Sequence, residues 1–83
     1  MYFVYILFSI RFKKTYVGIS NDIVRRLEEH NRGYSLYTNR YKPWIVIYKE
    51  KCENRIIARA KERYFKSSSG RRWMRRYIDI IDT

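Results

Sequence analysis

Residues 1–20, MYFVYILFSIRFKKTYVGIS, decide the fold of this chain. Two short stretches rich in aromatic and β-branched residues, at 2–8 and 15–19, lie on either side of a basic turn. This pattern predicts a β-hairpin. Tyr5 lies in the first strand and Tyr16 in the second, so we expect both phenols to reach the same neighbourhood. A phenol can shuttle protons and bind phosphate, which matters if the rest of the chain supplies a metal ligand and a cation.

The length and composition favour one domain spanning residues 1–83. Hydrophobic residues make up 46% of the chain and fifteen residues are aromatic, which argues for a packed core. No window approaches the roughly 20 apolar residues of a membrane span, and the apolar start lacks the features of a signal peptide. The single cysteine, Cys52, excludes an internal disulfide and fits a reducing compartment, so we expect a cytoplasmic protein with no membrane partner.

The charge of the chain is strongly positive. Nineteen Lys and Arg residues against eight Asp and Glu residues give a net charge of +11. Such an excess favours a polyanionic partner, most simply nucleic acid. A basic surface without a particular partner is the alternative. The segment 55–76 holds nine basic residues and one acid, Glu62, and a lone carboxylate in so basic a segment requires an explanation.

Beyond the hairpin the chain predicts further regular elements. Capping residues before Ile23 and Gly33 after the periodic stretch predict the two ends of a helix, the second in a left-handed turn. We expect a helix at 23–31, a loop at 32–43, a strand at 44–48, and two further helices at 55–67 and 71–80. The order β-β-α-β-α-α predicts an α/β fold in which a small three-stranded sheet is flanked by helices.

On the first expected helix, Ile23, Val24 and Leu27 form the predicted buried stripe. Arg26 and His30 are four residues apart, so they lie on one side of the helix, beside that stripe. From there Arg26 can reach a cleft and grip a phosphate with its fork of donors. Two alternatives stay open: a surface arginine paired with a nearby acid, and a histidine that favours the negative end of the helix dipole.

The second expected helix places Glu62 in an informative position. Its predicted inner stripe consists of four apolar residues, Ile56, Ile57, Ala60 and Tyr64. Glu62 falls on the border between this stripe and an arc of basic residues, where a cleft can hold a hydrated divalent ion. Mg²⁺ commonly takes only one or two protein carboxylates, together with waters and substrate phosphate. The alternative is a structural ion pair with Arg59 or Lys66. One cysteine and one histidine cannot build a structural zinc site.

These motifs together resemble the GIY-YIG nuclease family, and within it the small stand-alone members similar to the N-terminal nuclease domain of excinuclease C. The resemblance covers almost the whole chain, and its specificity lies in the order of the motifs. The matching segments are the strand motifs Phe3-Val4-Tyr5 and Tyr16-Val17-Gly18, the helix at 22–33, the loop at 38–44, the helix at 58–67 and the tail at 69–73.

The resemblance implies a three-stranded antiparallel sheet and a metal-dependent endonuclease that hydrolyses DNA phosphodiester bonds, in repair or recombination. It implies that Glu62 holds a Mg²⁺ or Mn²⁺ ion. Tyr5 and Tyr16 then orient the attacking water or take part in its deprotonation. Arg26 stabilises the charge on the phosphate, and His30 assists in the same cluster. A metal and an arginine together supply the charge stabilisation that such a cleavage needs.

Three departures from the family pattern accompany the resemblance. Phe3 replaces the first glycine, Ile19 stands where a lysine is frequent, and the late asparagine has no counterpart. A non-catalytic nucleic-acid-binding module is therefore the alternative, in which residues 55–76 grip backbone phosphates and aromatic side chains stack on bases. The aromatic candidates are Tyr34, Tyr37, Tyr41 and Trp73. A protein-interaction domain with incidental charge is a third reading. The sequence does not separate DNA from RNA and carries no signal of oligomeric state.

Overall fold

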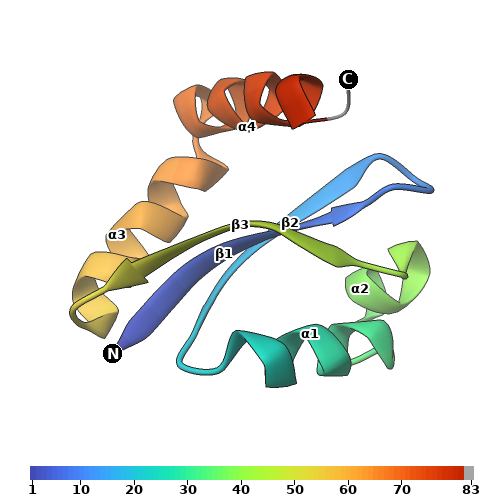
Figure 1. The fold of residues 1–83 in the computed structure, drawn as a ribbon, viewed down its shortest axis with the longest axis horizontal. Helices are drawn as coiled ribbons and strands as arrows, with labels where there is room; N and C mark the ends of the chain where they lie inside the picture. The colour runs from blue at the N-terminus through green and yellow to red at the C-terminus, as the bar shows by residue number, and fades with distance from the viewer. Residues whose placement is uncertain (82–83) are drawn as a thin grey trace.

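The computed structural model describes residues 1–81, which form a three-stranded antiparallel sheet with helices on both faces (Figure 1). The elements, in chain order, are β1 (Tyr2–Ser9), β2 (Lys14–Ser20), α1 (Ile23–Asn31), α2 (Leu36–Tyr41), β3 (Ile45–Cys52), α3 (Arg55–Lys66) and α4 (Ser68–Ile81). The strand order is β2-β1-β3, so β1 is central and β2 and β3 are edge strands. The predicted hairpin, the α/β class and the antiparallel sheet are confirmed.

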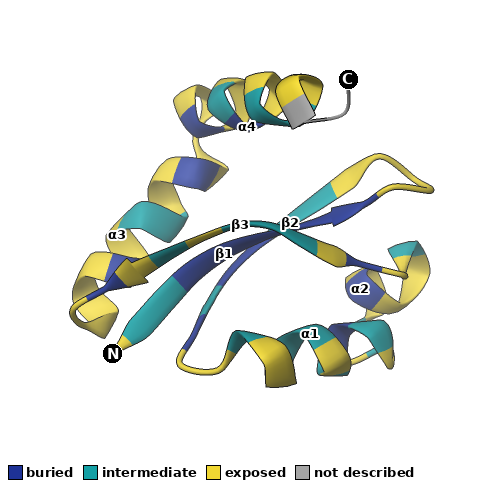
Figure 2. Ribbon diagram, in the orientation of Figure 1, coloured by how far each residue is buried: buried dark blue, intermediate teal, exposed yellow. Residues whose placement is uncertain are grey.

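The central strand is covered on both faces because its side chains alternate between two cores. Val4 and Ile6 pack against α3 and α4, whereas Tyr5 and Leu7 pack on the side of α1 and α2. All four side chains are fully buried, as the dark central strand in Figure 2 illustrates. A continuous apolar run is what a strand between two layers requires.

One predicted loop contains a helix. The stretch 32–43 holds α2, whose start is fixed by a reciprocal cap between Ser35 and Thr38. The Ser35 side chain accepts from the Thr38 N–H at 3.3 Å, and the Thr38 hydroxyl accepts from the Ser35 N–H at 3.2 Å. The Trp44 indole then donates to the Thr38 carbonyl at 2.9 Å. The loop interpretation was wrong because polar composition hid this cap, which satisfies the free N–H groups of a short helix.

Other boundaries differ by a few residues. The third strand runs on to Cys52, and the last helix begins at Ser68 rather than at residue 71. Only Ser67 separates the two last helices; its backbone is extended, with φ −82° and ψ 170°. Gly33 lies in the left-handed region as predicted, with φ +87°. No helix within residues 1–81 combines the length and apolar character that crossing a bilayer demands.

The predicted helix faces need correction. On α1, Ile23 and Leu27 pack against the core as predicted. Val24, however, is 70% exposed, and the buried residue of the helix is His30. On α3, Ile56 is 81% exposed, whereas Ala58 and Phe65 are buried. The reason lies in the neighbours: small Ala58 lets α3 approach the sheet closely, and α4 packs around Phe65. The predicted stripe on α3 therefore faces outward.

Candidate active site

The site begins where β1 and β2 pair. Tyr5 of β1 lies directly opposite Gly18 of β2. A Cβ atom on Gly18 would lie 2.6 Å from the Tyr5 hydroxyl and 3.1 Å from Cε2 of Tyr16. Real Cβ atoms essentially never come within 3.0 Å of another atom, so a larger residue at this position would have to displace the Tyr5 phenol. The absent side chain lets the Tyr5 phenol lie over β2, an edge strand, beside the ring of Tyr16.

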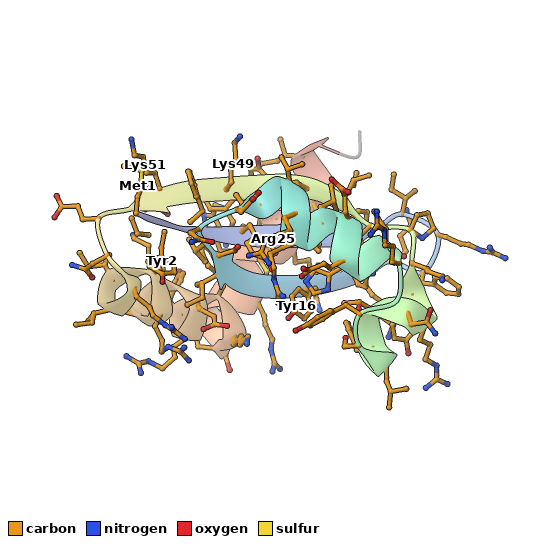
Figure 3. All side chains as sticks on the ribbon, turned by 90° about the horizontal axis from the view of Figure 1, so that it is seen from below. Met1, Tyr2, Tyr16, Arg25, Lys49 and Lys51 are labelled. Carbon is orange, nitrogen blue, oxygen red and sulfur yellow. The ribbon has the colours of Figure 1, made fainter. Side chains whose placement is uncertain are left out.

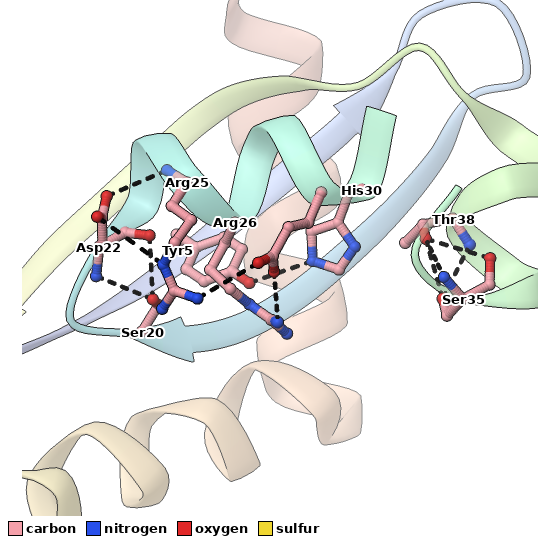
Figure 4. Close-up of polar contacts among 9 residues, drawn as sticks. Tyr5, Ser20, Asp22, Arg25, Arg26, His30, Ser35 and Thr38 are labelled. Carbon is pink, nitrogen blue, oxygen red and sulfur yellow. Dashed lines mark hydrogen bonds and ion pairs between the residues drawn. The ribbon is translucent and has the colours of Figure 1, made fainter. Parts of the chain in front are cut away.

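His30 joins the two tyrosines from α1. His30 is 1% exposed, and its Nε2 lies 3.4 Å from the Tyr5 hydroxyl (Figure 4). Its ring centre lies 4.6 Å from that of Tyr16. Burial lowers the pKa of His30, and the positive charge of Arg26 lowers it further. The imidazole is therefore neutral at pH 7. Its buried Nδ1 has no hydrogen-bond partner within the described chain, so no contact there fixes the tautomer.

Arg26 brings a positive charge to the same phenol. Its guanidinium donates to Glu29 at 2.9 Å and lies 4.8 Å from the centre of the Tyr34 ring. Burial raises the pKa of Tyr5, the nearby Arg26 guanidinium opposes that rise, and Tyr16 and Glu62 add to it. The Tyr5 phenol is thus protonated at neutral pH. The surface pairing of Arg26 that the sequence left open is present, but the guanidinium also faces the phenol.

Glu62 approaches from the opposite layer. It lies on α3 between Ala58 and Phe65, at the i, i+4 and i+7 positions of one helix face, and its side chain is only 16% exposed. Glu62 therefore lies on the inner face of the helix rather than on its border. Its negative charge makes a small contribution to the raised pKa of Tyr5. Lys66 pairs with the carboxylate at 3.1 Å.

Two small cavities flank this cluster along β2. One, of about 280 Å³, is lined by Tyr16 and Lys66 among others. The other, of about 220 Å³, is lined by Ser20, Arg26 and Arg55 among others. Larger and mainly apolar cavities, of about 600 and 670 Å³, are lined by β3 and the helices beside it, and they contain none of the predicted site residues. Of the predicted site residues, Tyr16 and Arg26 line these two small cavities, whose walls are more polar than those of the larger ones.

The donor set fits a hydrated divalent cation better than a fully protein-bound one. No group of three or more His, Cys, Asp or Glu side chains that could share a metal ion occurs within residues 1–81. Glu62 supplies a largely buried carboxylate, and one carboxylate suffices for Mg²⁺ when waters and phosphate complete the shell. The Lys66 partner is 57% exposed, and an exposed ion pair of this kind is worth only about 0.2–1 kcal/mol. A cation can therefore displace it.

Sequence reasoning missed several contributors. The sequence suggests Tyr34 only as a stacking partner for bases, but its ring lies against Arg26. Gly18 was identified only as part of a strand motif, but in the structure it makes room for the phenol of Tyr5. The register that places Gly18 opposite Tyr5 follows from the length of the hairpin turn, so this signal was available. Nothing in the helix pattern indicated that Tyr34 would fold back on Arg26.

Comparison with known proteins identifies the family of the chain. The model of the GIY-YIG catalytic domain matches residues 1–77. The chain is also similar to UPF0213 protein DP2720 of Desulfotalea psychrophila, with 36% identity over 56 residues, which cover 65% of this chain and 51% of the relative. The matched part is thus about half the length of that curated relative. No solved structure matches the chain. The chain belongs to the GIY-YIG catalytic-domain family, which is a family of nucleases.

Proposed function

We propose that this protein is a divalent-metal-dependent endonuclease that hydrolyses DNA phosphodiester bonds, acting in the cytoplasm on DNA under repair or recombination. One observation supports this above the others. Tyr5 of β1 contacts His30 and faces Arg26, which both lie on α1. The charge of Glu62, on α3, contributes to the raised pKa of Tyr5. Family membership supports the reaction class. The net charge of +11 supports a nucleic-acid substrate.

Tyr5 and His30 form the proton path of the proposed mechanism. The protonated phenol accepts a hydrogen bond from the attacking water at its oxygen. As the water loses a proton to that oxygen, the proton of the phenol moves to Nε2 of His30, which is free to accept in the tautomer protonated on Nδ1. Because nothing holds Nδ1, the ring can adopt that tautomer. The 3.4 Å separation has to shorten when substrate binds.

The remaining residues bind and stabilise. Arg26 contacts the non-bridging phosphate oxygens and stabilises their growing negative charge. Tyr16, against the His30 ring, orients the attacking water. Glu62 would hold the Mg²⁺ or Mn²⁺ ion, which would supply charge stabilisation to the phosphodiester and its leaving oxygen. Glu29 holds Arg26 in place through the 2.9 Å ion pair.

Nicking of supercoiled plasmid with Mg²⁺ or Mn²⁺ tests the proposal. We expect the wild-type protein to nick and Glu62→Ala to lose that activity. Glu53→Ala is the matched control, because Glu53 is an exposed carboxylate outside the site and close to the start of α3. Equal nicking by wild type and Glu62→Ala would overturn the metal assignment, since contaminating nuclease would then explain the activity.

A non-catalytic nucleic-acid-binding module is the second candidate. The ion pair between Lys66 and Glu62 favours it, because the carboxylate is already neutralised without a metal. This candidate predicts salt-sensitive binding of DNA or RNA without cleavage, and equal binding by Glu62→Ala with or without Mg²⁺. Metal-dependent nicking that requires Glu62 would exclude it.

A further inference from the structure

The cavity beside Tyr16 has the lining of a nucleotide-binding site. We call it the β2 cavity; its polar walls are Tyr16 and Tyr37 on one side and Lys66 and Arg71 on the other. The buried side chains Val17, Phe65 and Met74 also line it. It touches the candidate active site twice, because Tyr16 packs on His30 and Lys66 binds Glu62. A group that occupies it would therefore lie next to the reacting phosphate.

Tyr37 offers a fixed aromatic surface in this cavity. Its hydroxyl donates to the Thr15 carbonyl of β2 at 3.0 Å. Its ring is stacked on Trp44, with centres 5.9 Å apart and planes 30° apart. Even so, Tyr37 is 42% exposed. A ring that is anchored at its hydroxyl and supported by a buried tryptophan is pre-organised to stack on another flat group.

The opposite wall is cationic. Arg71 is exposed at the start of α4 and has no ion pair within residues 1–81, and Lys66 is the last residue of α3. No carboxylate is among the lining residues. A cavity with an aromatic wall and a cationic wall matches the two parts of a nucleotide, since bases stack on aromatic rings and phosphates bind arginine and lysine.

The size of the β2 cavity decides what form the nucleotide takes. At about 280 Å³ it lies at the lower limit of ordinary ligand pockets. Its lining residues come from β2, α2, α3 and α4, and α2 lies on the opposite face of the sheet from α3 and α4 (Figure 1). A double helix cannot enter such a space, but one unstacked nucleotide can.

We propose that the β2 cavity binds one unpaired nucleotide that flanks the scissile phosphate, with the base on Tyr37 and the phosphate on Arg71 and Lys66. This inference rests on the proposed nuclease function and adds the substrate class: DNA with a single-stranded segment at the cleavage position rather than a continuous duplex. Stacking of the base on Tyr37 supplies the binding energy. An unpaired nucleotide can stack without first breaking a base pair, whereas a paired one cannot.

Binding without cleavage tests this separately from catalysis. Anisotropy of labelled oligonucleotides in EDTA compares a single strand, a duplex with a single-stranded tail and a blunt duplex. We expect the wild type to bind the first two more tightly than the third. Tyr37→Ala removes the stacking surface and is expected to weaken binding of the tailed duplex about tenfold, whereas Tyr37→Phe keeps it. Arg71→Ala is expected to weaken binding of the tailed duplex more than Arg72→Ala does. Arg72 is the matched control, because it lies on the same helix but does not line the cavity.

A 2-aminopurine base placed in the single-stranded segment reports stacking directly, measured at protein concentrations at which each folded variant is bound to the DNA. Its fluorescence is expected to fall on binding to wild type and to Tyr37→Phe, and to stay high with Tyr37→Ala. Equal affinity for all three DNAs together with unquenched 2-aminopurine on wild type would overturn the proposal. If the wild-type protein did not nick plasmid but still showed these binding differences, the nuclease function would be overturned and the nucleotide site would stand.

Discussion

At the scale of the residue, the site depends on one missing side chain. Tyr5 reaches His30 only because Gly18 leaves its ring room. We expect Gly18→Ala to lose nuclease activity by about a hundredfold, because displacing a reacting group by an ångström has effects of that order. Overpacking adds about 1–3 kcal/mol of destabilisation. Plasmid nicking and urea unfolding measure the two effects.

Tyr5→Phe is the companion to that variant. It removes the hydroxyl and keeps the ring, so it should lower nicking without a comparable fall in stability. If Gly18→Ala nicked DNA at the wild-type rate, the phenol would not need its present position, and its assignment as the group that receives the water proton would fail.

A second residue-scale prediction concerns pH. The pKa of His30 is lowered in the folded protein, from 6.5, by burial and by Arg26. Below about pH 6.5 the unfolded chain takes up a proton at this residue while the folded protein does not, so the free energy of unfolding falls as the pH falls through this range. One such group changes that free energy by at most about 1.4 kcal/mol per pH unit.

Urea unfolding between pH 7.5 and 5 checks this, with His30→Gln as the comparison. The wild type should lose stability over this range more steeply than the variant. Glu50, whose pKa is lowered by Lys61 and Tyr48, loses its contribution only below its ordinary value of 4.5, so it does not confuse the result. Parallel pH profiles for the two proteins would mean that His30 titrates as it does in the unfolded chain.

At the scale of the element, α4 can pack closely against the end of α3 because residue 70 is a glycine. A Cβ atom on Gly70 would collide with the Tyr64 carbonyl and the backbone of Phe65. In an unconstrained helix, Gly→Ala stabilises by about 1 kcal/mol. Here we expect the opposite sign, a loss of about 1–3 kcal/mol from overpacking. Thermal or urea unfolding measures it, with the exposed neighbour Ser69→Ala as the control; stabilisation by Gly70→Ala would show that the two helices are not packed as described.

The same scale shows what the sequence can predict. The buried run of β1 and the hairpin were predictable because period and turn chemistry are local. The inner face of α1 was predicted in part, because Ile23 and Leu27 pack inward whereas Val24 is exposed. The inner face of α3 was not predicted, because Ile56 is exposed whereas Ala58 and Phe65 turn inward. Which face is buried depends on where neighbouring elements dock, and α4 decides this for Phe65. Tyr5, Arg26 and His30 were nonetheless expected together, because the family motif orders them along the chain.

At the scale of the whole molecule, charge and cavities indicate a path for the nucleic acid. The site residues gather at β2, with a basic cavity on either side, whereas Lys49 and Lys51 stand on β3 at the opposite edge of the sheet (Figure 3). If the DNA backbone follows β2, exposed Arg55, which lines one of these cavities, neutralises a phosphate. Lys49 has the same charge and a similar exposure but lies away from this path.

Salt titration of DNA binding in EDTA tests whether Arg55 contacts a phosphate and Lys49 does not. Each phosphate contact contributes about 0.7–0.9 to the slope of the logarithm of affinity against the logarithm of salt concentration. Arg55→Ala should therefore reduce the slope by roughly one contact and weaken binding to all sequences alike. Lys49→Ala should leave the slope unchanged, because Lys49 makes no phosphate contact on this path. The two variants lose the same charge, so a difference between their slopes reports the phosphate contact of Arg55. Equal slopes for Arg55→Ala and Lys49→Ala would mean that the protein binds DNA through its overall field, and that the nucleic acid does not follow the β2 edge.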